Sequence, residues 1–139
     1  MSDTPPPAGV ALAVYLSAST ARLIELRGYA RDLTAEGFKV VSSWLWAAGR
    51  PAGDAALRDL EDLRGADALL AVTSPRGASL QGRGGRHVEL GVAIERGLAV
   101  VVLGESEHIF HGLPGLYAAR DWPSALALLR SLRDGPSLR

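Results

Sequence analysis

The sequence ADALLAVTSPRGASLQGRGGRHVELGVAIERGLAVVVLGE, residues 66–105, decides the fold. Its first segment, residues 66–74, is apolar on both faces and predicts a buried strand. A Gly-, Ser- and Arg-rich loop without periodicity follows, and residues 86–96 then predict a helix that Gly97 ends. Residues 98–105 predict a second apolar strand. A strand, a helix and a strand in this order are typical of parallel strands joined by a helical crossover.

The same alternation extends along the chain in both directions. The other predicted strands are residues 10–19, 38–46 and 116–120, and the other predicted helices are residues 21–36, the segment from Asp54 to Arg64, and a segment capped by Asp121. Gly37 is predicted to end the first helix, and Pro123 suits the first turn of the last. The helical residues predicted to face inward are Leu23, Leu26, Ala30, Leu33, Leu57, Leu60, Leu63, Ala125, Leu128, Leu129 and Leu132.

This order predicts an α/β protein with a single-domain, doubly wound fold of the flavodoxin or Rossmann type. Its core is expected to be a five-stranded parallel sheet with helices on both faces. We expect a disordered Pro-rich N-terminus over residues 1–9, one domain over residues 10–135, and a C-terminal tail over residues 136–139.

Composition excludes several classes of protein. The 139 residues include no cysteine, which rules out disulfides, thiolate zinc sites and a cysteine nucleophile. The formal net charge is zero, so nothing indicates a nucleic acid polymer or an anionic membrane as a partner. The longest apolar run, residues 98–103, is too short to span a bilayer, and the N-terminus lacks the basic segment of a signal peptide. We therefore expect a soluble, cytoplasmic protein.

Ligands of such sheets bind at the carboxyl ends of the strands, where the Gly-rich loop of residues 75–85 lies. Two nucleotide-binding motifs fail there. Gly82 and Gly84 are followed by His87 where a Rossmann fingerprint needs a third Gly, and Arg83 with Gly84 replaces the Lys and hydroxyl residue of a Walker A loop. The three histidines do not form a metal-binding motif either, so we expect no metal and no cofactor.

Glu89 has two interpretations. It can be an acid in a first helical turn, stabilised by the helix dipole. It can also be a reactive carboxylate, because it follows the Gly-rich loop and precedes Leu90-Gly91, where a small residue lets a ligand approach. In the second interpretation, the helix N-terminus is expected to keep the carboxylate ionised.

Three motifs carry a family resemblance: Tyr15-Leu16-Ser17, R-D-L-E-D-L-R-G-A-D at residues 58–67, and V-E-L-G-V-A at residues 88–93. In their order and spacing, the chain resembles the nucleoside 2-deoxyribosyltransferase superfamily over about residues 10–130. It is most similar to the 2'-deoxynucleoside 5'-monophosphate N-glycosidase branch and to deoxyribosyltransferase-like proteins of phages and bacteria.

The resemblance implies cleavage of an N-glycosidic bond with retention of configuration. Glu89 would attack the anomeric carbon, Asp59 would bind sugar or base and help to protonate the leaving group, and Tyr15 would orient the nucleophile. The alternatives stay open: Asp59 can be a solvated helix acid beside Glu61 and Asp62, and Tyr15 can be a core residue.

The expected substrate-binding side chains include one departure from the family. Arg83 stands six positions before Glu89, where the transferases have Asp and the monophosphate glycosidases have Ser. With Arg76 and Arg86 it can bind a nucleotide phosphate or can simply be solvated. Trp44 and Trp46 are predicted to share one face of the second strand. The predicted substrate-binding set is Ser17, Ser19, Arg83, Gly85, Arg86 and His87.

The resemblance also implies a homodimer or larger oligomer, in which the segment after the fourth strand completes a neighbour's pocket. That segment is SEHIFHGLPG, residues 106–115, where Ile109 and Phe110 suit an interface and His108 or His111 can reach the partner's substrate.

The sequence therefore favours a hydrolase that releases the base of a nucleoside or of its 5'-monophosphate through Glu89, with base exchange as a variant. The C-terminus lacks the acidic end that the transferases use, which favours hydrolysis. The main alternative is a non-catalytic nucleotide-binding or sensor protein, and an NAD-type nucleosidase is a weaker one.

Overall fold

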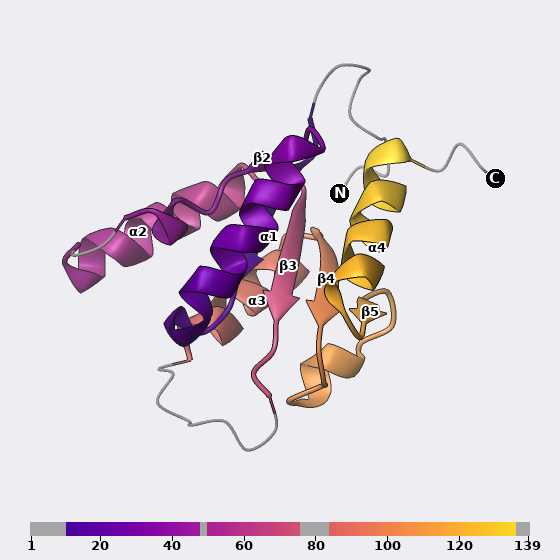
Figure 1. The fold of residues 1–139 in the computed structure, drawn as a ribbon. Coiled ribbons are helices and arrows are strands. Elements are labelled where there is room, and N and C mark those ends of the chain that lie inside the picture. The colour runs from indigo at the N-terminus through magenta and orange to yellow at the C-terminus, as the bar shows by residue number, and fades with distance from the viewer. Residues whose placement is uncertain (1–10, 48–49, 76–83, 136–139) are drawn as a thin grey trace.

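The computed structural model describes residues 11–47, 50–75 and 84–135, and it contains a five-stranded parallel sheet (Figure 1). The strand order is β2-β1-β3-β4-β5, which confirms the predicted fold class. The predicted N-terminal segment 1–9 and tail 136–139 lie outside the described residues. The strands are β1 (Ala13–Ser17), β2 (Lys39–Val40), β3 (Ala68–Val72), β4 (Ala99–Leu103) and β5 (Tyr117–Ala119).

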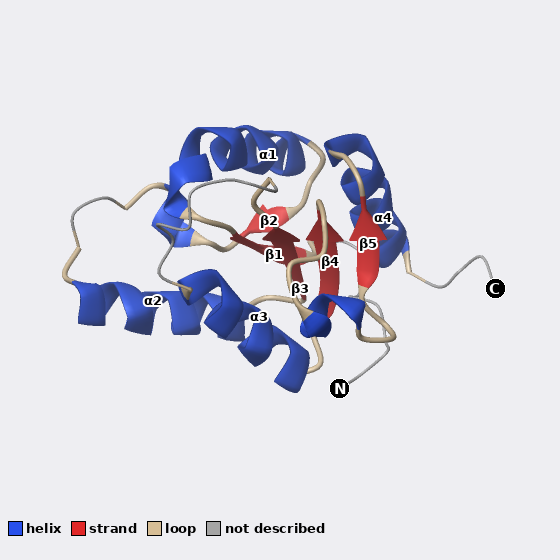
Figure 2. Cartoon of the chain, turned by 90° about the horizontal axis from the view of Figure 1, so that it is seen from below, coloured by secondary structure: helices blue, strands red, loops and turns tan. Residues whose placement is uncertain are grey.

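Helices cover both faces of the sheet. Helices α1 and α4 lie on one face, and α2 and α3 lie on the other (Figure 2). Alternate residues of β1 point to opposite faces of the sheet. Leu16 packs with residues of α1 and α4 on one face, and Tyr15 packs with Leu63 of α2 and Leu90 of α3 on the other. The helices are α1 (Leu23–Ala35), α2 (Ala52–Arg64), α3 (Gly85–Glu95) and α4 (Trp122–Asp134). None of them is long and apolar enough to cross a membrane.

The second strand is much shorter than predicted. Strand β2 ends at Val40, and a 3-10 helix, η2 (Ser43–Leu45), replaces the rest. The backbone N–H and the hydroxyl of Ser43 both donate to Asp62 Oδ2, at 3.0 and 2.6 Å, which turns the chain away from the sheet. Trp44 and Trp46 therefore do not share a strand face, contrary to the prediction. Trp44 is half-buried and donates to the Leu16 carbonyl at 2.8 Å, whereas Trp46 is 55% exposed.

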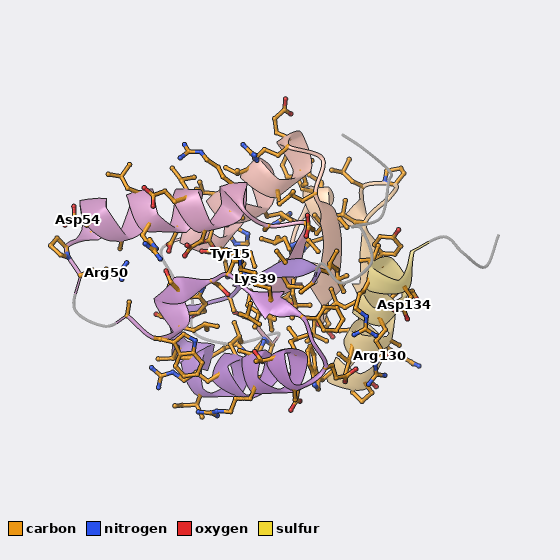
Figure 3. All side chains as sticks on the ribbon, turned by 90° about the horizontal axis from the view of Figure 1, so that it is seen from above. Tyr15, Lys39, Arg50, Asp54, Arg130 and Asp134 are labelled. Carbon is orange, nitrogen blue, oxygen red and sulfur yellow. The ribbon has the colours of Figure 1, made fainter. Side chains whose placement is uncertain are left out.

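Helix α2 also departs from the prediction. It begins at Ala52, directly after Pro51, so Asp54 lies in the first turn and does not cap the helix. Leu57 was predicted to face inward but is 64% exposed. The reason is that the N-terminal part of α2 projects past the sheet, and Asp54 lies at the end far from Tyr15 (Figure 3). Only the C-terminal part of α2 packs on the sheet, where Leu63 is buried.

The other helices confirm the predicted signals closely. A short 3-10 turn, η1 (Thr20–Arg22), precedes α1. Gly37 lies just after the end of α1, as predicted, and has a φ of 90°. Asp121 caps α4 by accepting a hydrogen bond from the Ser124 N–H at 2.9 Å. The predicted inward positions Leu26, Ala30, Leu33, Ala125 and Leu129 are buried, while Leu23, Leu128 and Leu132 are partly buried against the same core.

Gly104 ends β4 in a conformation that other residues rarely adopt. Its φ is 115°, and a Cβ placed there would lie 2.2 Å from Thr73 Oγ1. We expect Gly104→Ala to lower the free energy of unfolding by roughly 2–4 kcal/mol, from backbone strain together with overpacking. Gly28→Ala is the matched control, because it lies in α1 with open space around it. Urea denaturation should show the control unchanged or stabilised by about 0.5–1 kcal/mol, and equal stability of the two variants would contradict the argument.

Candidate active site

Glu89 lies at the centre of a hydrogen-bonded group at the carboxyl end of β1. The Tyr15 hydroxyl donates to Glu89 Oε2 at 2.5 Å, and the Ser17 hydroxyl donates to Glu89 Oε1 at 2.6 Å. Tyr15 and Ser17 are two residues apart on β1, so both side chains point to the α3 face of the sheet. Both carboxylate oxygens are thereby held in place by hydroxyl groups of one buried strand.

Asp59 reaches the same group from α2. Its carboxyl group lies close enough to Glu89 and Tyr15 for its charge to raise the pKa of both. Burial raises the pKa of Asp59, and the nearby charge of Asp62 raises it further. The three residues predicted to be catalytic therefore converge from β1, α2 and α3, although the first stands 74 positions before Glu89. Figure 3 places Tyr15 beside α2, which carries Asp59.

The charge state of Glu89 differs from the expectation. Glu89 stands in the second turn of α3, which begins at Gly85, and it is partly buried. Burial raises its pKa to about 7, while the hydrogen bonds from Ser17 and Tyr15 lower it and the negative charge of Asp59 raises it. Glu89 is therefore about half ionised at neutral pH. Tyr15 keeps its proton, because burial and the charge of Glu89 raise its pKa far above the usual value.

A second acid on α2 was not predicted to matter. Asp62, one turn after Asp59, accepts the two hydrogen bonds from Ser43 and lies 3.3 Å from Arg58 Nε. These contacts fasten η2 to α2, the helix that carries Asp59. The sequence signal was the spacing of the two acids by three residues, which places both on one helical face.

A small pocket opens at the carboxyl ends of β1 and β3, the edge of the sheet where the sequence predicted the site. Ser17, whose hydroxyl binds Glu89, lines this pocket, whereas Tyr15, Asp59 and Glu89 are not among its lining residues. The hydroxyl-bearing residues that line the pocket are Ser17 of β1 and Thr73, directly after β3. Its basic side chains come from α3 and from the segment after β4. The lining residues are Ser17, Ala71, Val72, Thr73, Arg86, His87, Leu90 and His111.

The structure places only some of the predicted substrate-binding residues at the pocket. Ser17, Arg86 and His87 line the pocket. Ser19 instead accepts a hydrogen bond from the Ala21 N–H at 3.3 Å, as a turn residue does. Gly85 is the first residue of α3, and Arg83 and Arg76 lie outside the described residues.

Arg86 is already paired. Its guanidinium binds both carboxylate oxygens of Glu107, with Nη2 2.7 Å from Oε2. The two side chains join the start of α3 to the segment after β4, where the 3-10 helix η3 (Ile109–Gly112) lies. Because Glu107 already neutralises Arg86, the pocket gains little net positive charge from this arginine.

The histidines of the segment after β4 contact their own chain. His108 Nε2 lies 3.1 Å from His87 Nδ1, and the His108 ring stacks on His111 at 3.9 Å between centroids. The predicted interface residues are open to solvent, since Ile109 is 83% and Phe110 54% exposed. In the described residues no group of His, Asp and Glu side chains is arranged to hold a metal ion.

Arg22 is a further residue that the sequence did not single out. Its guanidinium binds both carboxylate oxygens of Glu25 at 2.7 Å and donates to the carbonyl of Thr73. It thereby connects the loop after β1 to the start of the loop after β3. Asp67, by contrast, accepts a hydrogen bond from the Ala13 N–H at 2.8 Å, which ties the start of β3 to the start of β1, away from Glu89.

Solved structures with the same architecture were found by comparison. The structure of the Clostridium botulinum CMP N-glycosidase BcmB matches with a TM-score of 0.58 and 17% sequence identity, over 85% of this chain and 98% of that chain. This chain has the fold of a CMP N-glycosidase. A conserved protein from Enterococcus faecalis V583 matches with a TM-score of 0.55 and 16% identity, over 87% of each chain. The resemblance read from the sequence is thus confirmed at the level of the fold.

No model of a protein family and no curated protein matches the sequence. At such low identity the solved structures establish the architecture alone. What this chain does must therefore be argued from its own side chains.

Proposed function

We propose that the protein is an N-glycosidase of nucleosides or their 5'-monophosphates that works through a covalent glycosyl-Glu89 intermediate. The observation that carries this proposal is the binding of both Glu89 carboxylate oxygens by Tyr15 and Ser17, with Asp59 beside them. A carboxylate held in this way is oriented for attack on an anomeric carbon, and its charge stabilises an oxocarbenium-like transition state.

The proposed reaction has two steps. In the first, Glu89 forms a bond to C1' as the bond from C1' to the base breaks, and the base takes the bonding electrons and a proton from Asp59. In the second, water attacks C1', its proton passes to Asp59, and the C1'–Glu89 bond breaks. Two displacements at one carbon retain its configuration. A second base in place of water would give exchange, the transferase variant of the same chemistry.

A nucleotide substrate is supported by two features. The fold is that of a CMP N-glycosidase, and the pocket that Ser17 lines also carries the ring nitrogens of His87 and His111. A homodimer is part of the proposal, because Ile109 and Phe110 expose apolar surface next to that pocket. Size-exclusion chromatography with light scattering, with Phe110→Ser as the variant, tests the oligomeric state separately.

The function is tested with a panel of nucleosides, 2'-deoxynucleosides and their 5'-monophosphates, with and without an acceptor base. Liquid chromatography should detect a free base from at least one substrate, and a new nucleoside only if exchange occurs. Tight binding of a nucleotide with no base released over hours would instead support the non-catalytic nucleotide-binding alternative. The burial that raises the pKa of Glu89 to about 7 favours this alternative, because a protonated carboxyl group cannot attack C1'.

The pH dependence follows from the charge state of Glu89. Attack requires the ionised carboxylate of Glu89, so one limb of kcat/KM should rise with pH through about 7, and a falling limb should report the loss of the Asp59 proton that the first step uses. Ser17→Ala removes a hydrogen bond that lowers the pKa of Glu89, so the rising limb should move to higher pH. Ser19→Ala is the matched control, because Ser19 binds the Ala21 N–H and should leave the limb in place. A limb that moves to lower pH in Ser17→Ala would contradict this assignment.

A further inference from the structure

Two imidazole rings, those of His87 and His111, line the pocket that Ser17 shares, and the ring of His108 packs against both of them. The His108 ring lies on the His111 ring, with centroids 3.9 Å apart and planes at 29°, and it meets the His87 ring edge-on at 4.8 Å and 71°. His87 comes from the first turn of α3, and the other two come from the segment after β4. His87 and His111 line the pocket together with Ser17, whose hydroxyl binds Glu89.

The position of the His111 proton follows from its backbone contact. The Glu107 N–H points at His111 Nδ1, at 3.0 Å. A backbone N–H can only donate, so Nδ1 must accept and carries no proton. The neutral ring therefore holds its proton on Nε2.

The position of the His87 proton follows from the burial of His108. His87 Nδ1 and His108 Nε2 are 3.1 Å apart and share one proton. The buried Nδ1 of His108 has no hydrogen-bond partner among the described residues. A proton there would be an unpaired buried donor, which is rarer than an unpaired acceptor. His108 therefore donates from Nε2, and His87 keeps its own proton on Nε2.

The surroundings of His87 and His111 disfavour a positive charge on these two rings. Among residues 11–47, 50–75 and 84–135, the charged groups that act on these rings are Arg86 and Glu107, which form an ion pair with no net formal charge. Burial is the main cause that lowers the pKa of His87, and the positive charge of Arg86 lowers it further. Burial also lowers the pKa of His111, and the neighbouring His108 lowers it further. The positive end of α3 disfavours a proton on His87 as well. At neutral pH these two rings offer N–H donors without added charge.

We infer that His87 and His111 present two fixed Nε2–H donors that bind the phosphoryl group of a nucleotide. A phosphate monoester offers three acceptor oxygens and no donor when fully ionised, which matches a wall of donors. A sugar hydroxyl can also accept a hydrogen bond, but it offers one oxygen and carries a donor, so it matches two fixed N–H donors less well than a phosphoryl group does. The inference rests on the proposed nucleotide substrate and adds how this chain would recognise it.

The pH dependence separates this arrangement from charged histidines. Neutral donors bind the phosphate dianion, so affinity should stay level from pH 8 to about 6.5 and fall as the phosphate takes up a proton near pH 6. Charged imidazoles would act in the opposite direction, and affinity would rise as the pH falls. The sign of the change is therefore diagnostic.

The experiment uses the full chain with Glu89→Gln, which prevents turnover. Calorimetry compares cytidine 5'-monophosphate, cytidine and inorganic phosphate as ligands, which separates a nucleotide phosphate from free phosphate. We expect His111→Leu to weaken nucleotide binding roughly tenfold while cytidine binding stays unchanged. His111→Gln should restore most of the loss, because its amide N–H can replace Nε2–H. Arg96→Gln, at an exposed position after α3, is the matched control. Nitrogen-15 spectra should show His87 and His111 protonated on Nε2 alone.

Several results would overturn the inference. They are no measurable nucleotide binding, an equal loss of cytidine and nucleotide binding in His111→Leu, an Nδ1–H or doubly protonated His111, or affinity that rises from pH 8 to pH 6. The proposed function fails separately. If the unmodified protein releases no base but Glu89→Gln shows the expected pattern, the phosphate site stands and the glycosidase proposal falls. If the unmodified protein releases a base but Glu89→Gln does not show the expected binding pattern, the glycosidase proposal stands and the phosphate site falls.

Discussion

Glu89→Gln is expected to abolish release of the base, lowering kcat by roughly 10⁴-fold or more. Glutamine keeps the size of the side chain and one oxygen that can accept from Tyr15 or Ser17. It cannot form a stable bond to C1', and it carries no charge to stabilise the oxocarbenium-like transition state. Liquid chromatography of the free base, under conditions that give one turnover of the unmodified enzyme, measures the loss.

The same variant should be more stable than the unmodified protein at alkaline pH. The pKa of Glu89 is raised from 4.5 to about 7 in the folded state, so the native protein holds a proton that the unfolded chain loses. The stability that this proton contributes is present below pH 4.5 and is lost as the pH rises to about 7. Glutamine mimics the protonated acid and should escape the loss.

We therefore expect the free energy of unfolding of Glu89→Gln to exceed that of the unmodified protein by a few kcal/mol at pH 8, on the order of the 1.36 kcal/mol per pKa unit. The difference should vanish near pH 4.5. Inactivity combined with this gain would show that the variant is folded. Retained base release would sink the covalent mechanism, and a variant less stable at pH 8 would contradict the raised pKa.

The sheet could be predicted from the sequence because its strands are buried on both faces. Residues 68–72 and 99–103 are runs of apolar residues with glycine or polar residues around them, and this pattern has few other structural solutions. The second strand was overestimated for the same reason. Its β-branched and aromatic residues read as a strand, while a contact between Ser43 and Asp62, 19 residues apart, decides the local structure.

The group of side chains around Glu89 could be predicted only in part. The motifs around Tyr15, Asp59 and Glu89 indicated which residues belong together, and the parallel order of the strands indicated the edge where they meet. The charge state could not be predicted, because it depends on burial under α2, which no local pattern specifies. The contact among His87, His108 and His111 was also not predicted. His87 and His108 are 21 residues apart, and they meet only because of the turn after β4.

Asp59→Asn is expected to slow cleavage of a natural nucleotide by roughly 10²–10⁴-fold. Asparagine can still bind sugar or base, but it cannot deliver a proton to the departing base. A substrate with an activated leaving group, such as a nitrophenyl glycoside, needs little protonation and should be slowed much less. Removing the negative charge also removes a cause of the raised pKa of Glu89, so the rising limb of kcat/KM should move to lower pH.

Glu61→Gln is the matched control, because Glu61 is an exposed acid on the same helix, two positions from Asp59. Opposite faces of the helix separate the two side chains, and the control should keep both the rate and the pH profile. If Asp59→Asn slows natural and activated substrates equally, Asp59 positions the substrate and does not protonate the base. If the rising limb of kcat/KM in Asp59→Asn moves to higher pH, the charge of Asp59 does not raise the pKa of Glu89, and burial alone accounts for the raised value.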